Sequence, residues 1–258
     1  MSSPTAPSEL CFLAAVSALC RPALAMSAEL EDYYAARAPE YDRVYQKPER
    51  QADLRSIERW LAEVFAGKTL LEIACGTGYW SRFLAPVAKS VVALDASREV
   101  LRIARSRVKA GHASFVQGDA YRPPEDRGPF DSAFAGFWLS HVPISRLGEF
   151  FRGLHRALAP GAKVVLLDNR FVEGSSTPIS EQDEQGNTYQ ARPLDDGSVH
   201  RVLKNFPSEQ ALRERVAGIA ADVRYHQWQY FWALEYVAAV SPDHSFERTP
   251  DGSAHVER

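Results

Sequence analysis

The chain has 258 residues, of which 45% are hydrophobic and 24% charged, and a formal net charge of −3 at pH 7. This length and composition predict one globular α/β domain with an elaboration, and the lack of a basic excess argues against a nucleic-acid-binding protein. Three cysteines, at positions 11, 20 and 75, are too few and too scattered for a disulfide framework or a metal site. A reducing, cytoplasmic setting is therefore expected.

The first 25 residues predict an extension that is not a targeting segment. Small residues follow the apolar run at 10–20, as in a secretory signal, but no Lys or Arg precedes the run. The run is also too short to cross a membrane as a helix. We expect residues 1–25 to be disordered, with Met26 as an alternative start. Residues 26–240 are expected to form the domain, and the polar residues 241–258 a disordered tail.

Apolar runs of strand length then alternate with amphipathic helical patterns. Helices are expected at 49–65, 79–86, 97–109 and 145–158, and strands at 69–75, 90–96, 113–119, 130–138 and 162–170. Ser97 is suited to cap its helix, with Glu99 in the first turn. This alternation predicts βαβ crossovers and a parallel sheet that is covered on both faces.

The alternation of predicted strands and helices ends after residue 170. Residues 186–204 contain two strand-like arms around Asp195-Asp196-Gly197, which is a hairpin signature. We therefore expect an inserted β-hairpin within about residues 171–205. A helix at 207–219 and two extended segments within 223–239 follow.

The stretch LEIACGTGYW, residues 71–80, ends the first predicted strand in a glycine-rich turn. Gly76 and Gly78 allow a sharp turn and let backbone N–H groups approach a ligand. A phosphate-binding loop would need Gly-Lys-Ser/Thr where Tyr79-Trp80-Ser81 stands. The spacing to Ser81 fits a dinucleotide fingerprint only loosely. Asp95, at the end of the second strand, suits ribose hydroxyls in either case, so a nicotinamide-type cofactor remains an alternative.

Three motifs in combination resemble the class I S-adenosylmethionine-dependent methyltransferases. They are EIACGTG at 72–78, Asp95 after the second strand, and Gly118-Asp119-Ala120 after the third, in the order and spacing of that family between about residues 69 and 170. Ala74 stands where many members have glycine. The resemblance implies a Rossmann-like α/β fold with a mostly parallel seven-stranded sheet, and S-adenosylmethionine as the cofactor.

The resemblance also implies which residues meet the cofactor. The loop residues Ala74, Gly76 and Gly78 would lie against its amino-acid end, and Glu72 would order the loop or meet the ammonium group through water. The remaining contacts would come from Asp95 and Ala96 at the ribose, and from Asp119 and Ala120 at the adenine. In similar methyltransferases a segment like DYYAARAPEYDRVY, residues 32–45, folds over the cofactor as a lid, which would bring Tyr34, Arg37 and Tyr41 to it. A surface helix packed by tyrosines is the alternative for this segment.

The stretch GFWLSHVP, residues 136–143, follows the fourth strand, where this fold places its ligands. It lacks the Asn/Asp-Pro-Pro-aromatic run of methylases that act on nucleic-acid amines, so a small-molecule acceptor is expected. Phe137 and Trp138 would stack on the cofactor or the acceptor, with core packing as the alternative. His141 would orient or deprotonate the acceptor, or else cap the next helix.

A narrower resemblance involves residues 168–207. This insert, together with the SHVP element and the tyrosine-rich opening, is similar to the methyltransferase domain of ovothiol-biosynthesis enzymes, over about residues 31–235. That family methylates an imidazole nitrogen of 5-thiohistidine. The resemblance implies an in-line displacement, with Asn169, Arg170, Tyr189, Arg192 and Lys204 available for the substrate's carboxylate and ammonium groups. A small-molecule N- or O-methyltransferase of other specificity is the alternative.

Overall fold

A computed structural model describes residues 38–109 and 111–239, with side chains from residue 42 onward. The expected extension at 1–25 and tail at 241–258 lie outside the described residues, as do Tyr34 and Arg37. No helix in the described part of the chain is both long and apolar enough to cross a membrane.

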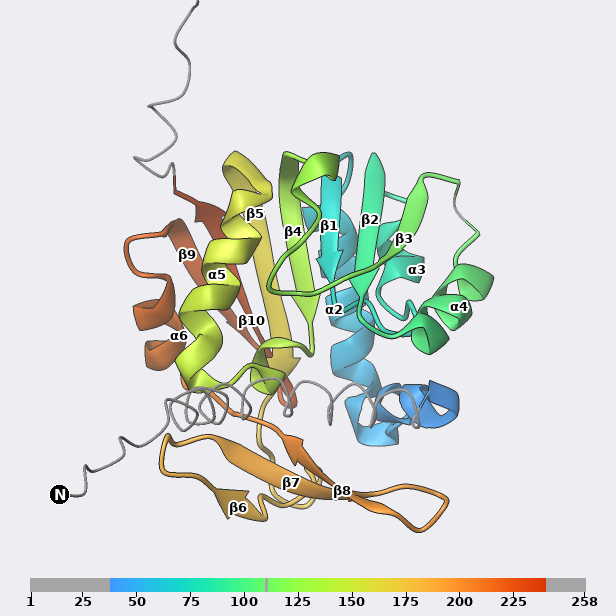
Figure 1. The fold of residues 1–258 in the computed structure, drawn as a ribbon, viewed down its shortest axis with the longest axis vertical. Helices are drawn as coiled ribbons and strands as arrows, with labels where there is room; N and C mark the ends of the chain where they lie inside the picture. The colour runs from blue at the N-terminus through green and yellow to red at the C-terminus, as the bar shows by residue number, and fades with distance from the viewer. Residues whose placement is uncertain (1–37, 110, 240–258) are drawn as a thin grey trace, which may run out of the picture.

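A seven-stranded sheet forms the centre of the molecule, in the order β3-β2-β1-β4-β5-β10-β9 (Figure 1). Strands β1 to β5 are parallel, and β10 is antiparallel to both β5 and β9. The strand bounds are β1 Thr69–Ile73, β2 Ser90–Asp95, β3 Ala113–Gln117, β4 Phe130–Gly136, β5 Leu158–Asn169, β9 Ala220–Gln227 and β10 Phe231–Ala238. The predicted Rossmann-like fold with a mostly parallel sheet is confirmed.

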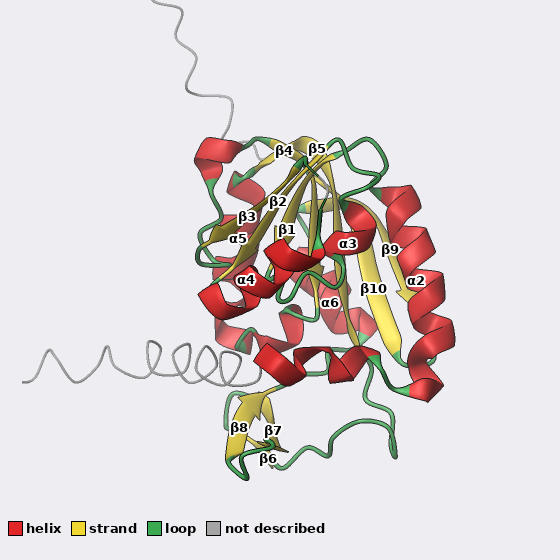
Figure 2. Ribbon diagram, turned by 90° about the vertical axis from the view of Figure 1, so that its right-hand side faces the viewer, coloured by secondary structure: helices red, strands yellow, loops and turns green. Residues whose placement is uncertain are grey.

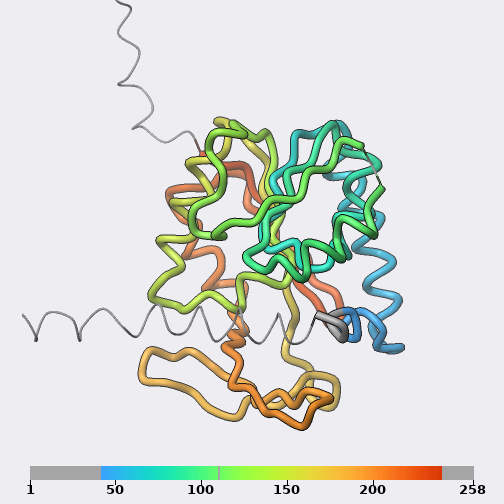
Figure 3. The backbone as a smooth tube through the Cα atoms, turned by 45° about the vertical axis from the view of Figure 1, so that its right-hand side comes forward, coloured from blue at the N-terminus to red at the C-terminus, as the bar shows by residue number. Residues whose placement is uncertain are grey.

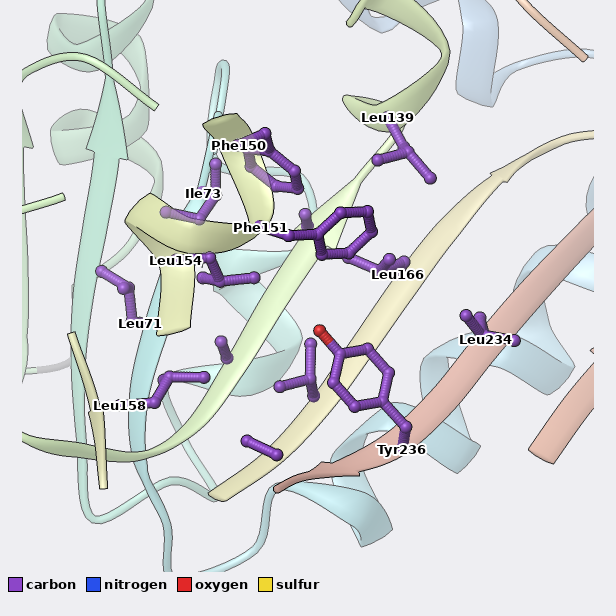
Figure 4. Close-up of a cluster of buried hydrophobic side chains, with 14 of the residues drawn as sticks. Leu71, Ile73, Leu139, Phe150, Phe151, Leu154, Leu158, Leu166, Leu234 and Tyr236 are labelled. Atoms are coloured by element: carbon purple, nitrogen blue, oxygen red, sulfur yellow. The ribbon is translucent and has the colours of Figure 1, made fainter. Parts of the chain in front are cut away.

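Helices cover both faces of this sheet (Figure 2). Alternate residues of β1 serve the two faces: Leu71 and Ile73 pack on the side of α5 and α6, and Leu70 on the side of α2, α3 and α4. Figure 4 shows side chains of α5 lying over the first of these faces. The helices are α2 Gln51–Val64, α3 Ser81–Leu84, α4 Arg98–Arg107, α5 Leu147–Arg156 and α6 Glu209–Val216, with short 3-10 helices η2 Ala38–Tyr45, η3 Pro48–Arg50, η4 Glu125–Arg127, η5 Leu139–His141 and η6 Ile144–Arg146.

Several helix predictions differ from the structure in extent; the helix expected at 207–219, for example, is α6, Glu209–Val216. Ser97 caps α4 as expected, because its hydroxyl accepts from the N–H of Val100. The helix expected at 79–86 contains only the four residues of α3. Turn-type bonds spanning three residues flank it, such as Phe83 N–H to Trp80 O, and Pro86 has no N–H to continue the ladder. The helix expected at 145–158 begins two residues later, after η6.

The insert after β5 forms its own three-stranded sheet, consisting of β6 Glu181–Gln182, β7 Thr188–Pro193 and β8 Val199–Leu203. Strands β7 and β8 are the two arms of the predicted hairpin, which is confirmed, and β6 was not predicted. This sheet lies beyond the carboxyl ends of the parallel strands (Figure 1). Figure 3 shows that the segments entering and leaving it both connect to the main body at this end. The hairpin is thus held over the edge where ligands bind in this fold.

Candidate active site

The loop after β1 alternates between ordinary and left-handed backbone. Ala74, Gly76 and Gly78 have φ values of +52°, +54° and +77°. This path turns the loop at the strand end, where the Cys75 N–H donates to Leu94 O over 2.9 Å. The Asp95 carboxylate accepts from the N–H groups of Gly76 at 2.8 Å and Ser97 at 3.0 Å. Asp95 therefore joins the glycine loop to the end of β2.

Glu72 lies beneath the same loop and is 1% exposed. Its Oε2 accepts from the Ser81 hydroxyl over 2.6 Å, whereas Oε1 is buried and has no hydrogen-bond partner among the described residues. Burial, opposed by the Ser81 bond and aided by the charge of Asp95, raises the pKa of Glu72 to about 8. An unpaired buried carboxyl oxygen beside a turn of this shape fits an ammonium group or a water that bridges to one.

The third motif follows β3 and lies next to the second. The Gly118 N–H donates to Asp95 O over 3.0 Å, and a side chain at Gly118 would come within 2.6 Å of Leu94 Cδ1. Asp119 is exposed and its Oδ1 accepts from the Tyr121 N–H over 2.9 Å. The predicted cofactor residues Ala96 and Ala120 are the immediate chain neighbours of Asp95 and Asp119. The structure thus brings the three motifs together at one edge of the sheet.

The end of the tyrosine-rich segment packs onto the glycine loop. The ring of Tyr45 stacks on Tyr79 with 3.5 Å between centroids and lies 5.5 Å from Phe137. The Thr77 hydroxyl donates to Asp42 over 2.7 Å, and Arg107 forms an ion pair with the same carboxylate. These contacts come from Asp42 and Tyr45, which the sequence did not single out. Tyr34, Arg37 and the side chain of Tyr41 fall outside the described residues and stay predictions.

A cavity of about 290 Å³ lies beside Phe137, between η2 and η3, the carboxyl ends of β4 and β5, and the insert. Its cationic lining residues are Arg43, Lys47, Arg50, Arg192 and Lys204, and its other lining residues are Val44, Tyr45, Phe137, His141, Asn169, Ser175, Ser176, Thr177, Gln190, Pro193 and Phe206. Among the residues that the structure describes, no lining residue is an aspartate or a glutamate. The described lining is therefore basic in a chain whose formal net charge is −3, although Arg43 forms an ion pair with Asp195 outside the lining.

Three of these cations have only neutral hydrogen-bond partners among the described residues. Arg50 donates to Asn169 Oδ1 at 2.9 Å, Lys47 to Ser175 O at 2.5 Å, and Arg192 to Gln190 Oε1 at 2.7 Å. Burial lowers the pKa of both Lys47 and Arg50. These side chains are oriented by the protein, but no carboxylate in the lining neutralises them, which suits a bound anion.

Lys204 differs from them because a carboxylate neutralises it. Its Nζ donates to Asp168 Oδ1 over 2.8 Å and to the Ser140 hydroxyl over 2.6 Å. Asp168, which is fully buried at the end of β5, also accepts from the Ser140 N–H over 3.0 Å. Although burial opposes ionisation, Lys204 and His141 hold the pKa of Asp168 below its ordinary value. This buried ion pair fixes the insert to the end of the sheet.

His141 lies between this pair and the cavity and is 5% exposed. Its Nδ1 is 2.6 Å from Leu203 O. Because a carbonyl oxygen only accepts, Nδ1 carries the proton, and Nε2 is the acceptor atom of the neutral ring. Burial and the charge of Lys204 place the pKa of His141 well below its usual range. The ring is therefore neutral at physiological pH.

Three predicted acceptor residues do not line the cavity. Trp138 packs against the core, with its ring 6.1 Å from that of Tyr121, on the opposite side of the sheet from Phe137. Arg170 donates to Trp228 O over 2.8 Å and so holds the turn between β9 and β10. Tyr189 donates to Asp183 over 2.9 Å within the hairpin. Trp138 therefore fits its core-packing alternative, and the described contacts of Arg170 and Tyr189 are structural; acceptor contacts by these three residues stay predictions.

The other predicted acceptor residues, His141, Asn169, Arg192 and Lys204, do meet at the cavity, together with Phe137. Sequence reasoning missed Lys47 and Arg50, and also Gln190 and the segment 175–177. The only local signal was QKPER at 46–50, a cationic stretch between the tyrosine-rich segment and the first helix.

Comparisons with known proteins agree with this geometry. Residues 70–161 match the family model described as a methyltransferase domain. The demethylmenaquinone methyltransferase of Shouchella clausii is 34% identical over 112 residues, which are 41% of this chain and 47% of that protein. The chain thus spans about half the length of the curated relatives it matches.

Two solved structures match over a larger share of the chain. The DhpI–SAM–HEP complex is 30% identical, with a TM-score of 0.68, and the match covers 82% of this chain and 97% of that one. The DhpI–SAH complex is 29% identical, with a TM-score of 0.66, and covers 82% and 96%. These two complexes contain the cofactor and its demethylated product, which fits the glycine loop, Asp95 and the unpaired oxygen of Glu72. The chain belongs to the class I S-adenosylmethionine-dependent methyltransferases.

Proposed function

We propose that this methyltransferase acts on a small acceptor that carries an anionic group, and that the basic cavity binds this group. The observation that carries the proposal is the described lining, which has five cationic side chains and no carboxylate. Arg43 and Lys204 are paired with Asp195 and Asp168 outside the lining, so Lys47, Arg50 and Arg192 carry the argument. Lys47, Arg50 and Arg192 are held in place by neutral oxygens, so an anionic group would supply their missing counter-charge.

Bound S-adenosylmethionine supplies an electrophilic methyl group on a sulfonium centre. The acceptor's nucleophilic atom forms a bond to the methyl carbon while the carbon–sulfur bond breaks and its electron pair goes to sulfur. The chain's part is orientation, since the reaction needs an in-line approach. The rings of Tyr45 and Phe137 stack on each other and form an aromatic wall of the cavity. His141, which also lines the cavity, is suited to orient the acceptor.

The most specific form of the proposal keeps an imidazole nitrogen of 5-thiohistidine as the nucleophile. Its carboxylate would meet Arg50, Arg192 or Lys204. Its ammonium group has fewer hydrogen-bond acceptors available, because the side-chain oxygens of Asn169 and Gln190 already accept from arginines. An acceptor with an anionic group but no ammonium group suits the same lining.

The test is methyl transfer with matched acceptors, followed by formation of S-adenosylhomocysteine. 5-Thiohistidine is compared with its decarboxylated amine, which keeps the nucleophile and loses the anion, and with a demethylmenaquinone-type quinol as a neutral acceptor. We expect the parent enzyme to turn over 5-thiohistidine faster than the decarboxylated amine. Arg192→Gln should remove this preference. Equal rates for acid and amine, or a preference for the quinol, would overturn the anionic acceptor. Turnover of other anionic acceptors alone would remove 5-thiohistidine.

A further inference from the structure

A second cavity, of about 310 Å³, lies beneath the hairpin sheet, against the beginnings of α5 and α6. Most of its lining is apolar and is contributed by Leu139, Ile144, Leu147, Phe151, Ile179 and Leu212. Three of these, Leu139, Phe151 and Leu212, belong to the buried core of this side of the main sheet. The cavity is thus bordered by the core on one side and by the insert on the other.

Two polar residues that line this second cavity, Thr188 and Asn205, are hydrogen-bonded within the protein, and the exposed Arg215 lies at its rim. The Thr188 hydroxyl donates to Lys204 O, and the Asn205 amide donates to Val142 O over 3.2 Å and accepts from the Thr188 N–H over 2.9 Å. Since these groups have their partners, the surface they leave is suited to an apolar group, unlike the cationic lining of the first cavity.

One face of strand β7 runs past both cavities. Thr188 lines the apolar cavity, and Gln190 and Arg192 line the basic one. Because alternate residues of a strand share a face, these three side chains form one row about 13 Å long at 3.3 Å per residue. Phe206, which follows β8, lines both cavities. The two cavities therefore lie end to end under one sheet face, apolar at Thr188 and cationic at Arg192.

We propose that the acceptor is amphipathic: its anionic group binds between Arg50 and Arg192, and an apolar tail extends past Phe206 into the second cavity. This inference rests on the function proposed above and adds the chemical class of the acceptor. The insert would then select acceptors by the length of the apolar tail that it covers. A hairpin that served only to exclude water would not select acceptors by tail length.

Calorimetry with straight-chain carboxylates in the presence of S-adenosylhomocysteine tests the arrangement without requiring turnover. The probes are acetate, hexanoate and octanoate. Affinity is expected to rise with chain length, by about fourfold at most for each methylene group that is buried. Arg192→Gln should weaken all three probes, and Ala211→Phe, which places a ring in the apolar cavity, should abolish only the gain with length. Gln210→Phe, at an exposed position of the same helix, is the control and should match the parent.

Ile179→Trp blocks the same cavity from its rim, where Ile179 is 41% exposed, and so keeps the test valid if Ala211→Phe fails to fold. Affinity that does not depend on chain length would overturn the tail site while leaving the anion site intact. Affinity could instead rise with chain length in Arg192→Gln as in the parent, but not in Arg215→Gln, which changes the far rim. This result would show an independent fatty-acid site and would also overturn the proposal. If Arg192→Gln binds acetate with the same affinity as the parent, the result would count against the proposed function itself.

Discussion

The Arg50 guanidinium donates to the side-chain oxygen of Asn169 over 2.9 Å, although 119 residues separate the two in the chain. The same guanidinium donates to the Ser175 hydroxyl over 3.0 Å. Arg50 is 4% exposed, and both of these partners are neutral. The nearby charges of Glu49 and Asp53 favour the charged form of Arg50, and an anion in the cavity would add a counter-charge that is hydrogen-bonded to it directly.

Replacing Arg50 with Gln should therefore weaken acceptor binding far more than cofactor binding. Loss of a charge-assisted hydrogen bond corresponds to about 1.5–3 kcal/mol, or about 10- to 150-fold in the acceptor's KM. The affinity for S-adenosylhomocysteine should stay within about twofold if these contacts serve only the acceptor. Steady-state kinetics and calorimetry separate the two effects.

Arg59→Gln is the matched control, because it makes the same charge change on the exposed side of α2. A comparable rise in KM for both variants would point to a general electrostatic effect. A loss of cofactor affinity in Arg50→Gln would assign this arginine to the cofactor instead.

Asp95→Ala should weaken cofactor binding. In addition to the ribose contact expected from the family, Asp95 accepts from the N–H groups of Gly76 and Ser97, so the variant also loosens the glycine loop. We expect a loss of about 1.5–3 kcal/mol in the affinity for S-adenosylhomocysteine by calorimetry. Asp126→Ala, at an exposed position in η4, is the control. Unchanged affinity in Asp95→Ala would remove the assignment.

Glu72 predicts a specific dependence of stability on pH. Its pKa is raised to about 8 in the folded protein from 4.5, so the folded state holds a proton that the unfolded state releases between these values. The contribution of this group is fully present below about pH 4.5 and is lost as pH rises through about 8. Glu72→Gln should flatten the fall in the free energy of unfolding across this window, measured by urea denaturation at several pH values. Parallel profiles for parent and variant would contradict the raised pKa.

Much of the fold and the cofactor edge was predictable from local patterns. Continuous apolar runs indicated buried parallel strands, Ser97 marked a helix start, and Asp195-Asp196-Gly197 marked the hairpin. The three cofactor motifs each follow a parallel strand. The carboxyl ends of parallel strands lie at one edge of the sheet, whatever conformation the loops adopt. For this reason their proximity followed from their order alone.

The acceptor cavity was not predictable in the same way. Lys47 and Arg50 reach it from a segment before the sheet, and Arg192 from an insert beyond it, so their meeting depends on tertiary packing that no local pattern encodes. Phe137 and Trp138 pack on opposite sides of the sheet, and Phe137 has a left-handed φ of +61°. A non-glycine residue is rarely found there, so the sequence carried no signal of it.

The buried pair of Lys204 and Asp168 predicts a large loss of stability when one partner is removed. Lys204→Met leaves the Asp168 carboxylate buried without its counter-charge, which costs about 3–5 kcal/mol. Adding Asp168→Asn should recover part of this loss. Arg201→Met on β8 is the control, because its pair with Glu181 is about half exposed and contributes only about 0–1 kcal/mol. Equal losses for the two single variants, in chemical denaturation, would show that burial does not distinguish the pairs.

Gly78 and Gly67 allow backbone strain to be separated from close contact. Both have left-handed φ values, +77° and +71°. A Cβ at Gly78 would lie 3.1 Å from Ala104 Cβ, whereas nothing lies within 4 Å of one at Gly67. Gly67→Ala should therefore cost only the strain of the left-handed backbone, about 1–2 kcal/mol, with cofactor affinity unchanged. Gly78→Ala should cost more and also weaken S-adenosylhomocysteine binding, because α4 must move away from the loop. If both variants lose the same stability and keep full affinity, the contact with Ala104 is not what requires glycine at position 78.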